Sequence, residues 1–200
     1  MDDCLVADLT RRIQEHGQIP VESIPEIELY MDQLLTFLNH RLPISPTGPN
    51  LQSFTKTMIN NYTKDRLLIP PKNKKYAQQH ILLLILIFNL KGILSISDIK
   101  KLFEPILRDI TTPDDDLIPL EDIYTTYLDL SAKYLDEFGA DFTRKLKFIT
   151  DKTAHLEGDA NTRVAQLFLS VLILVAQANL SKRLAELIIE THFDQKEESP

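Results

Sequence analysis

Three polar residues, Lys56, Asn60 and Lys64, recur every four positions in the segment TKTMINNYTK. Residues four apart lie on one face of a helix, so these three side chains share a face, which Thr57 and Asn61 flank. An asparagine amide can pair with both N6 and N7 of adenine in the major groove, while lysines contact phosphates. The spacing therefore predicts a helix that reads DNA bases through Asn60, Asn61 and Thr57.

A basic stretch with two prolines, PPKNKKY, comes after this segment. Pro70 and Pro71 cannot continue a helix, so we expect an extended loop with at most one small hairpin over residues 67–76. Lysines in such a loop could reach phosphates beside the groove. The predicted phosphate contacts on the helix and the loop are Lys56, Tyr62, Lys64, Lys72, Lys74 and Lys75. The alternative for both sets of residues is an ordinary solvated surface.

The charge is divided unevenly along the 200 residues, whose net charge is −7. Residues 46–108 hold 10 Lys and Arg against 3 Asp and Glu, whereas residues 1–45 hold 3 against 8 and residues 109–200 hold 9 against 18. A locally basic segment in an acidic chain indicates a polyanionic partner for that segment alone.

The periodicity of apolar residues predicts helices throughout the chain and no βαβ pattern. The expected helices cover residues 24–42, 54–64, 77–91, 95–105, 120–138, 140–156, 161–180 and 181–193. Gly139 is expected to end one helix and Ser181 to cap another, and Ser95 with Asp98 suits a capping box. We therefore predict an all-α protein with three parts: N-terminal helices (1–45), a DNA-binding domain (46–108) and a helical body (118–194), for dimerisation or effector binding.

The order of these elements resembles the DNA-binding head of the MerR type, a winged helix-turn-helix. Ile59 and Tyr62 match the recognition helix. The residues that match the wing are Leu67, Leu68, Pro70, Pro71, Lys72 and Tyr76, and the sequences LKG and LSISDIKKL match the helical segments after the wing. Asn60–Asn61 stands where the family has an Arg-Tyr pair, and the helix at 25–42 would replace the family's first helix.

The segments LYMDQLL, TKTMINNYTK and PPKNKKY also resemble an uncharacterised bacterial family that is defined as a domain of unknown function. This resemblance covers residues 25–180 and implies a MerR-like head joined to a helical body. It supplies no activity. The expected function is a DNA-binding transcription regulator whose partner is double-stranded DNA. The alternative is a helical protein-interaction module that has lost DNA binding.

We expect neither an enzyme nor a cofactor, because no nucleophile motif, glycine-rich phosphate loop or paired-carboxylate site is present. The histidines lack metal-ligand spacing, and the DDD run at 114–116 is typical of a solvated linker, so no metal is expected. The single cysteine, Cys4, cannot form a disulfide within the chain. A cytoplasmic location is predicted, since the acidic N-terminus does not resemble a signal peptide.

Two apolar runs, residues 81–88 and 164–180, are predicted to be buried helices with no membrane role. The first is too short to span a bilayer, and three polar residues interrupt the second: Gln166, Ser170 and Gln177. Because the second helix is apolar on nearly all sides, we expect the helical body to form a homodimer. Its three tyrosines, 124, 127 and 134, are expected to form a core seam or, alternatively, to line the pocket of an unknown small-molecule effector.

Overall fold

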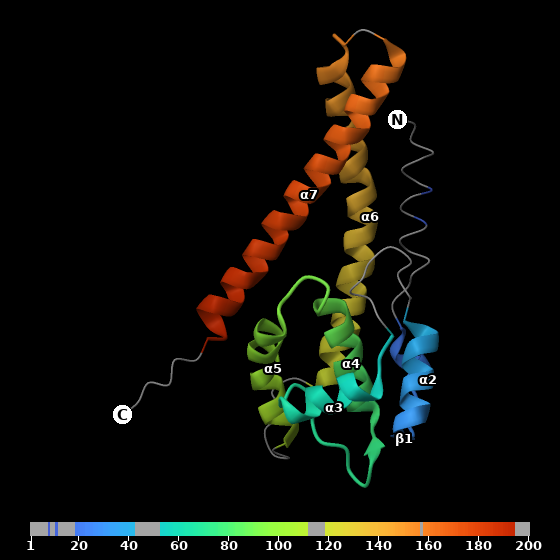
Figure 1. The fold of residues 1–200 in the computed structure, drawn as a ribbon, viewed down its shortest axis with the longest axis vertical. Coiled ribbons are helices and arrows are strands. Elements are labelled where there is room, and N and C mark those ends of the chain that lie inside the picture. Colours follow the sequence, from blue (N-terminus) through green and yellow to red (C-terminus); the bar gives the residue numbers. More distant parts are fainter. Residues whose placement is uncertain are drawn as a thin grey trace. The chain divides into compact units, whose positions relative to one another are not determined.

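Helices make up most of the chain in a computed structural model that describes residues 8, 11, 19–42, 53–111, 119–156 and 158–194. The elements in order are the 3₁₀ turn η1 (Val21–Ser23), β1 (Leu29–Tyr30), α2 (Met31–Arg41), α3 (Lys56–Lys64), β2 (Lys75–Tyr76), α4 (Gln78–Leu90), α5 (Ile96–Thr111), α6 (Leu120–Thr153) and α7 (Asp159–His192) (Figure 1). Within the described residues the only sheet has two strands, so the predicted all-α class is confirmed. Residues 43–52, 112–118 and 195–200 lie outside the described residues, and with them the DDD run at 114–116 that was expected to be a solvated linker.

The chain divides into two compact units. The first, which we call the head unit, comprises residues 18–128 with residues 185–200. The second, the hairpin unit, comprises residues 129–184 with residues 1–17. Helices α6 and α7 each contribute residues to both units.

Helix α4 forms the centre of the head unit. Every side chain from His80 to Phe88 is buried, which confirms the predicted buried helix at 81–88. A helix that is apolar on all sides needs neighbours on all sides. The core cluster supplies them from α2 (Leu34), α3 (Ile59) and α5 (Phe103). Packing against α4 therefore holds α3, the helix that carries most of the predicted DNA-binding residues.

The N-terminal part of the predicted helix at 24–42 is a strand. Leu29 pairs with Tyr76 and Tyr30 pairs with Lys75 in an antiparallel register. Helix α2 begins only at Met31, where the Gln33 side chain accepts a hydrogen bond from the Tyr30 N–H over 2.9 Å. The small hairpin expected within residues 67–76 is present as an antiparallel bridge between Lys72 and Lys75, and β2 also pairs with β1, which was not predicted.

Three helices run past the residues that were expected to end them. α5 continues through Pro105, α6 continues through Gly139, and α7 continues through Ser181. Inside a helix, relative to alanine, a glycine costs about 1 kcal/mol, a serine costs less and a proline costs about 3 kcal/mol. Packing on each side of the weak residue offsets that cost, as where the Phe138 and Phe142 rings stack across the turn containing Gly139. The predicted pairing of Ser95 and Asp98 at the start of α5 is present in part of its capping-box form: the Ser95 hydroxyl accepts from the Asp98 N–H over 3.1 Å and donates to the Asp98 carboxylate over 2.6 Å.

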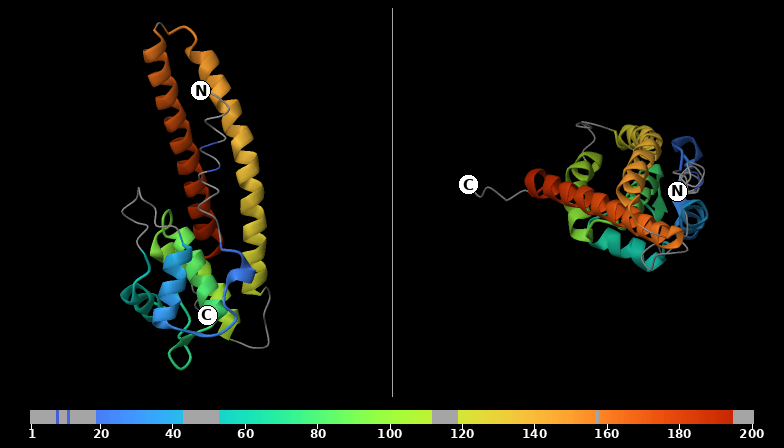
Figure 2. Two further views of the ribbon diagram at one scale, coloured as in Figure 1. Left: turned by 90° about the vertical axis from the view of Figure 1, so that its right-hand side faces the viewer. Right: turned by 90° about the horizontal axis from the view of Figure 1, so that it is seen from above.

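In the hairpin unit, α6 and α7 run antiparallel and are joined by a short connection in which Gly158 has a φ of +89° (Figure 2). Their shared core is small and consists of Phe142 and Leu146 with Phe138 and Leu174 packed against them. The prediction that residues 164–180 form a buried helix is wrong for the single chain, because most of its apolar side chains are exposed. By length and composition, α7 is the one helix of the described chain that could cross a membrane.

Candidate nucleic-acid interface

Helix α3 presents a continuous polar face. The Thr55 side chain caps its N-terminus by accepting a hydrogen bond from the Met58 N–H over 3.2 Å. Ile59 is fully buried on the opposite side. The exposed side chains are those of Lys56, Thr57, Asn60, Asn61 and Lys64. The structure therefore brings all three predicted base-reading residues together with two of the predicted phosphate contacts.

Tyr62 has a different position from the other predicted contacts. Its side chain is only 8% exposed and belongs to the core, and burial raises the pKa of its hydroxyl. Its carbonyl accepts hydrogen bonds from the N–H groups of Leu67 (2.8 Å) and Leu68 (3.1 Å). Tyr62 thus anchors the chain where it leaves α3, and the prediction that it contacts phosphate needs correction: it is a packing residue.

Asn39 of α2 holds the start of α3 in place. The Phe54 N–H donates to the Asn39 side-chain oxygen over 2.7 Å, and the Asn39 amide donates to the Phe54 carbonyl over 3.0 Å. Phe54 is itself buried, 3% exposed, and the Lys91 ammonium lies 4.9 Å from its ring centroid. Sequence reasoning missed Asn39, since its partner lies fifteen positions away.

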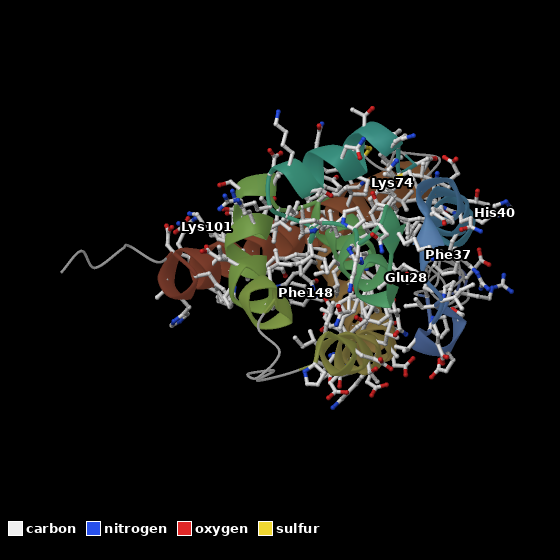
Figure 3. The ribbon with its side chains drawn as sticks, turned by 90° about the horizontal axis from the view of Figure 1, so that it is seen from below. Glu28, Phe37, His40, Lys74, Lys101 and Phe148 are labelled. Carbon is white, nitrogen blue, oxygen red and sulfur yellow. The ribbon has the colours of Figure 1, made fainter. Side chains whose placement is uncertain are left out.

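The basic loop ends in a tight turn at Lys72–Lys75. Asn73 and Lys74 have φ values of +52° and +61°, and the Lys75 N–H donates to the Lys72 carbonyl over 2.9 Å. Two successive positive φ values closed by this bond define a type I′ turn, in which the second central position is normally glycine. Lys72 and Lys74 are exposed, and Figure 3 labels Lys74. The fold therefore tolerates a strained lysine at the tip of the turn.

Lys75 is engaged within the protein. Its ammonium lies 3.9 Å from the Glu28 carboxylate, also labelled in Figure 3, and 5.6 Å from the centroid of the Tyr30 ring. Its side chain is 37% exposed. These contacts attach the turn to the segment around β1, so Lys75 is less suited to phosphate contact than Lys72 and Lys74.

A buried histidine supports the chain just after the turn. His80 is 5% exposed, and its ring meets the edge of Tyr76 at a centroid distance of 5.4 Å. The Nδ1 atom accepts from the Ala77 N–H over 3.0 Å at the start of α4, and among the described residues no partner lies within hydrogen-bond geometry of Nε2. Burial lowers the pKa of His80 below its usual value of 6.5, although the carbonyls of Pro70 and Ile69 are near enough to raise this pKa slightly. The imidazole is therefore held in its neutral form near neutral pH.

An open pocket of about 640 Å³ lies beside the end of α3. It is lined by Thr63, Arg66, Leu68, Ile69, Pro70, Lys100, Glu104 and Leu107, which come from α3, α5 and the chain between α3 and the turn.

The three tyrosines that were predicted to form a core seam or a pocket do not line this pocket. Tyr124 is fully buried and donates a 2.7 Å hydrogen bond to the Ile19 carbonyl, and burial raises its pKa to about 12. Tyr134, by contrast, is exposed in the hairpin unit.

The arrangement of α2 and α3 departs from a simple helix-turn-helix. In that motif, a turn of roughly three to four residues joins the helices. Here α2 ends at Arg41 and α3 begins at Lys56, and the Asn39–Phe54 pair closes this longer connection.

No curated protein and no solved structure matches the chain. A family model does match: a domain of unknown function, DUF1836, covers residues 19–127. This range nearly coincides with residues 18–128, the continuous part of the head unit, and holds all the predicted DNA-contacting residues. The expected relation to an uncharacterised family is thereby confirmed over a shorter range than the predicted 25–180. More than half of the chain is matched, and the protein therefore belongs to the DUF1836 family.

Proposed function

We propose that this protein is a cytoplasmic transcription regulator that binds double-stranded DNA in the manner of a MerR-like head. Helix α3 enters the major groove, where Asn60, Asn61 and Thr57 meet base edges. Lys56 and Lys64 on the same helix, with Lys72 and Lys74 on the turn, contact phosphates. The observation that carries the proposal is the exposed polar face of α3, which a buried core holds in the only basic part of the chain.

The dimensions of α3 suit this role. With its side chains an α-helix is about 10–12 Å across, which fits the roughly 12 Å width of the major groove, and the nine residues of α3 give it about 13 Å of length. The turn at Lys72–Lys75 follows α3 in the chain and lies below it in Figure 1. Phosphate contacts from the turn could therefore accompany base contacts from α3.

The uneven charge favours a single docking orientation. Residues 46–108 carry seven more basic than acidic residues, whereas residues 1–45 and 109–200 are both acidic. DNA attracts the first segment and repels the others, and such steering acts mainly at low ionic strength. The pocket beside the C-terminal end of α3 is where a small-molecule effector would act on the reading helix.

Titration of the purified full chain on labelled DNA tests the proposal. Fragments selected from the parent genome would first provide a preferred site, and a random duplex of equal length would serve as its control. Anisotropy at several salt concentrations should give a strongly negative slope of log affinity against log salt. With four lysines on phosphates, we expect a slope of about −3 to −4 per protomer.

The competing function is a helical protein-interaction module, which the exposed apolar surface of α7 favours. Under that alternative, folded protein would show no binding to either duplex even at low salt, and genomic selection would enrich no fragment. That result would overturn the DNA-binding proposal.

A further inference from the structure

Helix α7 exposes ten large apolar side chains in the part that belongs to the hairpin unit. The large apolar side chains exposed in its hairpin-unit part are Val164, Leu167, Phe168, Leu169, Val171, Leu172, Ile173, Val175, Leu180 and Leu184. In its most apolar window of 18 residues, only 6% of the residues are buried. Scattered exposed apolar residues need no explanation, but a continuous patch of this kind marks an interaction surface.

The contact between α6 and α7 uses the side of α7 that carries its polar residues and Leu174. Gln166 donates to the Thr153 hydroxyl over 3.1 Å, and the Lys145 ammonium donates to the Gln177 side-chain oxygen over 2.7 Å. Ser170, between these two glutamines on the same side, is 4% exposed. The hairpin is thus joined along the less apolar side of α7, and α6 leaves the apolar sides uncovered.

The uncovered surface has the spacing of a helix–helix seam. Val164, Phe168, Val171 and Val175 succeed one another at intervals of four, three and four residues and are 66%, 64%, 58% and 50% exposed. This is the alternation of the a and d positions in a coiled coil. We call these four residues the outer stripe.

A groove beside the outer stripe extends the apolar surface onto α6. It has a volume of about 540 Å³, and its apolar lining consists of Phe148 and Ile149 from α6 with Leu169, Leu172, Ile173 and Ala176 from α7. Phe148 is 62% exposed although it lies beside this apolar lining. Such a groove between two antiparallel helices can receive a third helix.

We propose that α7 of a second copy of this chain covers the outer stripe and the groove, so that two α6–α7 hairpins form a four-helix bundle. The outer stripe belongs to α7, which also lines the groove. A two-fold axis can therefore place the outer stripe of each copy in the groove of the other. Residues 164–184 span about 30 Å of helix, so the contact can extend along most of the hairpin-unit part of α7. Near the groove α6 carries four basic residues, Arg144, Lys145, Lys147 and Lys152, and two acidic residues, Asp141 and Asp151, and Asp141 pairs with Arg144 and Lys145 within the chain.

A bilayer is the other environment that could cover α7, and the pairing with α6 argues against it. The α6 residues from Asp141 to Lys152, which carry six charges, lie antiparallel to the apolar part of α7, and α6 is bonded to α7 at Lys145 and Thr153. A bilayer that took in α7 would have to take in these charges, which are costly within hydrocarbon. A protein partner leaves the charged side of α6 in water.

Sedimentation velocity of the full chain at micromolar concentration tests the proposal, which does not depend on DNA binding. We expect a species of twice the 23.0 kDa chain mass. Phe168→Glu/Val175→Glu should lower the mass to that of one chain. The matched control is Ile93→Glu, which places a glutamate at a 58% exposed isoleucine of the head unit and should leave the dimer intact.

A second measurement covers the case in which the double variant fails to fold. The unfolding temperature of the wild type should rise with protein concentration, because dimerisation stabilises the folded chain by mass action. The milder Phe168→Ala/Val175→Ala should remove that dependence. Circular dichroism would confirm that each variant compared keeps its helical content.

Three outcomes would overturn the proposal. The wild type could sediment as a single chain, with an unfolding temperature independent of concentration. A dimer could form that neither double variant weakens, which would place its interface elsewhere. Finally, monomeric wild type could float with vesicles of phosphatidylcholine and phosphatidylglycerol, and the stripe variants could abolish flotation, in which case the occupant is a membrane.

Discussion

The Asn39 side chain forms two hydrogen bonds with the backbone of Phe54, through its oxygen over 2.7 Å and through its nitrogen over 3.0 Å. The amide thus satisfies both backbone groups of a buried residue, as a neighbouring strand would. This pair ties the last turn of α2 to the residue that precedes the cap of α3. The position of the proposed reading helix depends on it.

Asn39→Ala should lower the free energy of unfolding by about 1–3 kcal/mol, because a part-buried N–H and carbonyl lose their partners. Asn39→Asp keeps the acceptor for the Phe54 N–H but places a carboxylate oxygen against the Phe54 carbonyl, so it should also lower the free energy of unfolding. Urea titration would show this as a lower midpoint at an unchanged slope. Equal midpoints for wild type and Asn39→Ala would show that the pair adds nothing to stability.

The double variant Lys72→Ala/Lys74→Ala should weaken binding to all DNA sequences alike. Each phosphate contact contributes about 0.9 to the slope of log affinity against log salt, so the slope should flatten by about 2 per protomer. Lys133→Ala/Lys147→Ala removes two exposed lysines from α6 and is the charge-matched control, with an unchanged slope expected. If both double variants bind random DNA as the wild type does at every salt concentration, the turn does not contact DNA.

Asn60→Ala should act only on the preferred site. Loss of a bidentate contact to adenine costs about 1–3 kcal/mol of discrimination, whereas binding to random DNA and the salt slope should stay nearly unchanged. Titrations of wild type and variant on both duplexes measure the two effects. An equal loss on the preferred and random duplexes would indicate that Asn60 contacts the backbone and reads no base.

Two substitutions of Lys74 can separate the effect of its charge on DNA binding from the effect of its backbone strain on stability. Its φ of +61° costs a non-glycine residue on the order of 1 kcal/mol, which glycine avoids. Lys74→Gly and Lys74→Ala should both flatten the salt slope by about 0.9. Only Lys74→Gly should relieve the strain, so we expect it to unfold at a higher urea concentration than Lys74→Ala. The reverse order of stability would contradict the strained turn.

His80 should make stability depend on pH. Burial lowers its pKa in the folded state below the unfolded value of 6.5, so between these two values the unfolded chain binds more protons. The free energy of unfolding should therefore decline as the pH falls below about 6.5 and level off below the folded pKa. His80→Gln keeps an acceptor for the Ala77 N–H and does not titrate, so the stability of wild type relative to this variant should decrease in that window. A constant difference between pH 8 and pH 5 would exclude His80 as the cause.

Local chemistry made several features of the head predictable. The spacing of Lys56, Asn60 and Lys64 placed them on one face because helix geometry depends on neighbours in sequence. The Ser95–Asp98 pairing was predictable for the same reason, since both partners lie within one turn. The burial of α4 was predictable from a run of apolar residues that leaves no polar side for water.

Features that depend on distant partners could not be predicted in this way. Leu29–Tyr30 form a strand because Lys75 and Tyr76 offer their backbone groups, which no periodicity in residues 24–42 reveals. The Asn39–Phe54 pair likewise joins residues on two sides of a long connection. Gly139 was expected to end a helix, yet the packing of its neighbours outweighs the small penalty that a glycine imposes on a helix.

Helix α7 shows most clearly which features follow from the sequence and which depend on tertiary structure. Its sequence by itself determined that it is a long apolar helix, because hydrophobicity and periodicity are properties of the residues. Which side faces α6 was decided only by tertiary contacts, through Gln166, Ser170 and Gln177. Since α6 can satisfy just one side of α7, the outer stripe and the groove remain exposed in a single chain. Burial is a property of the assembled structure, so composition could predict an apolar helix but could not determine what covers it.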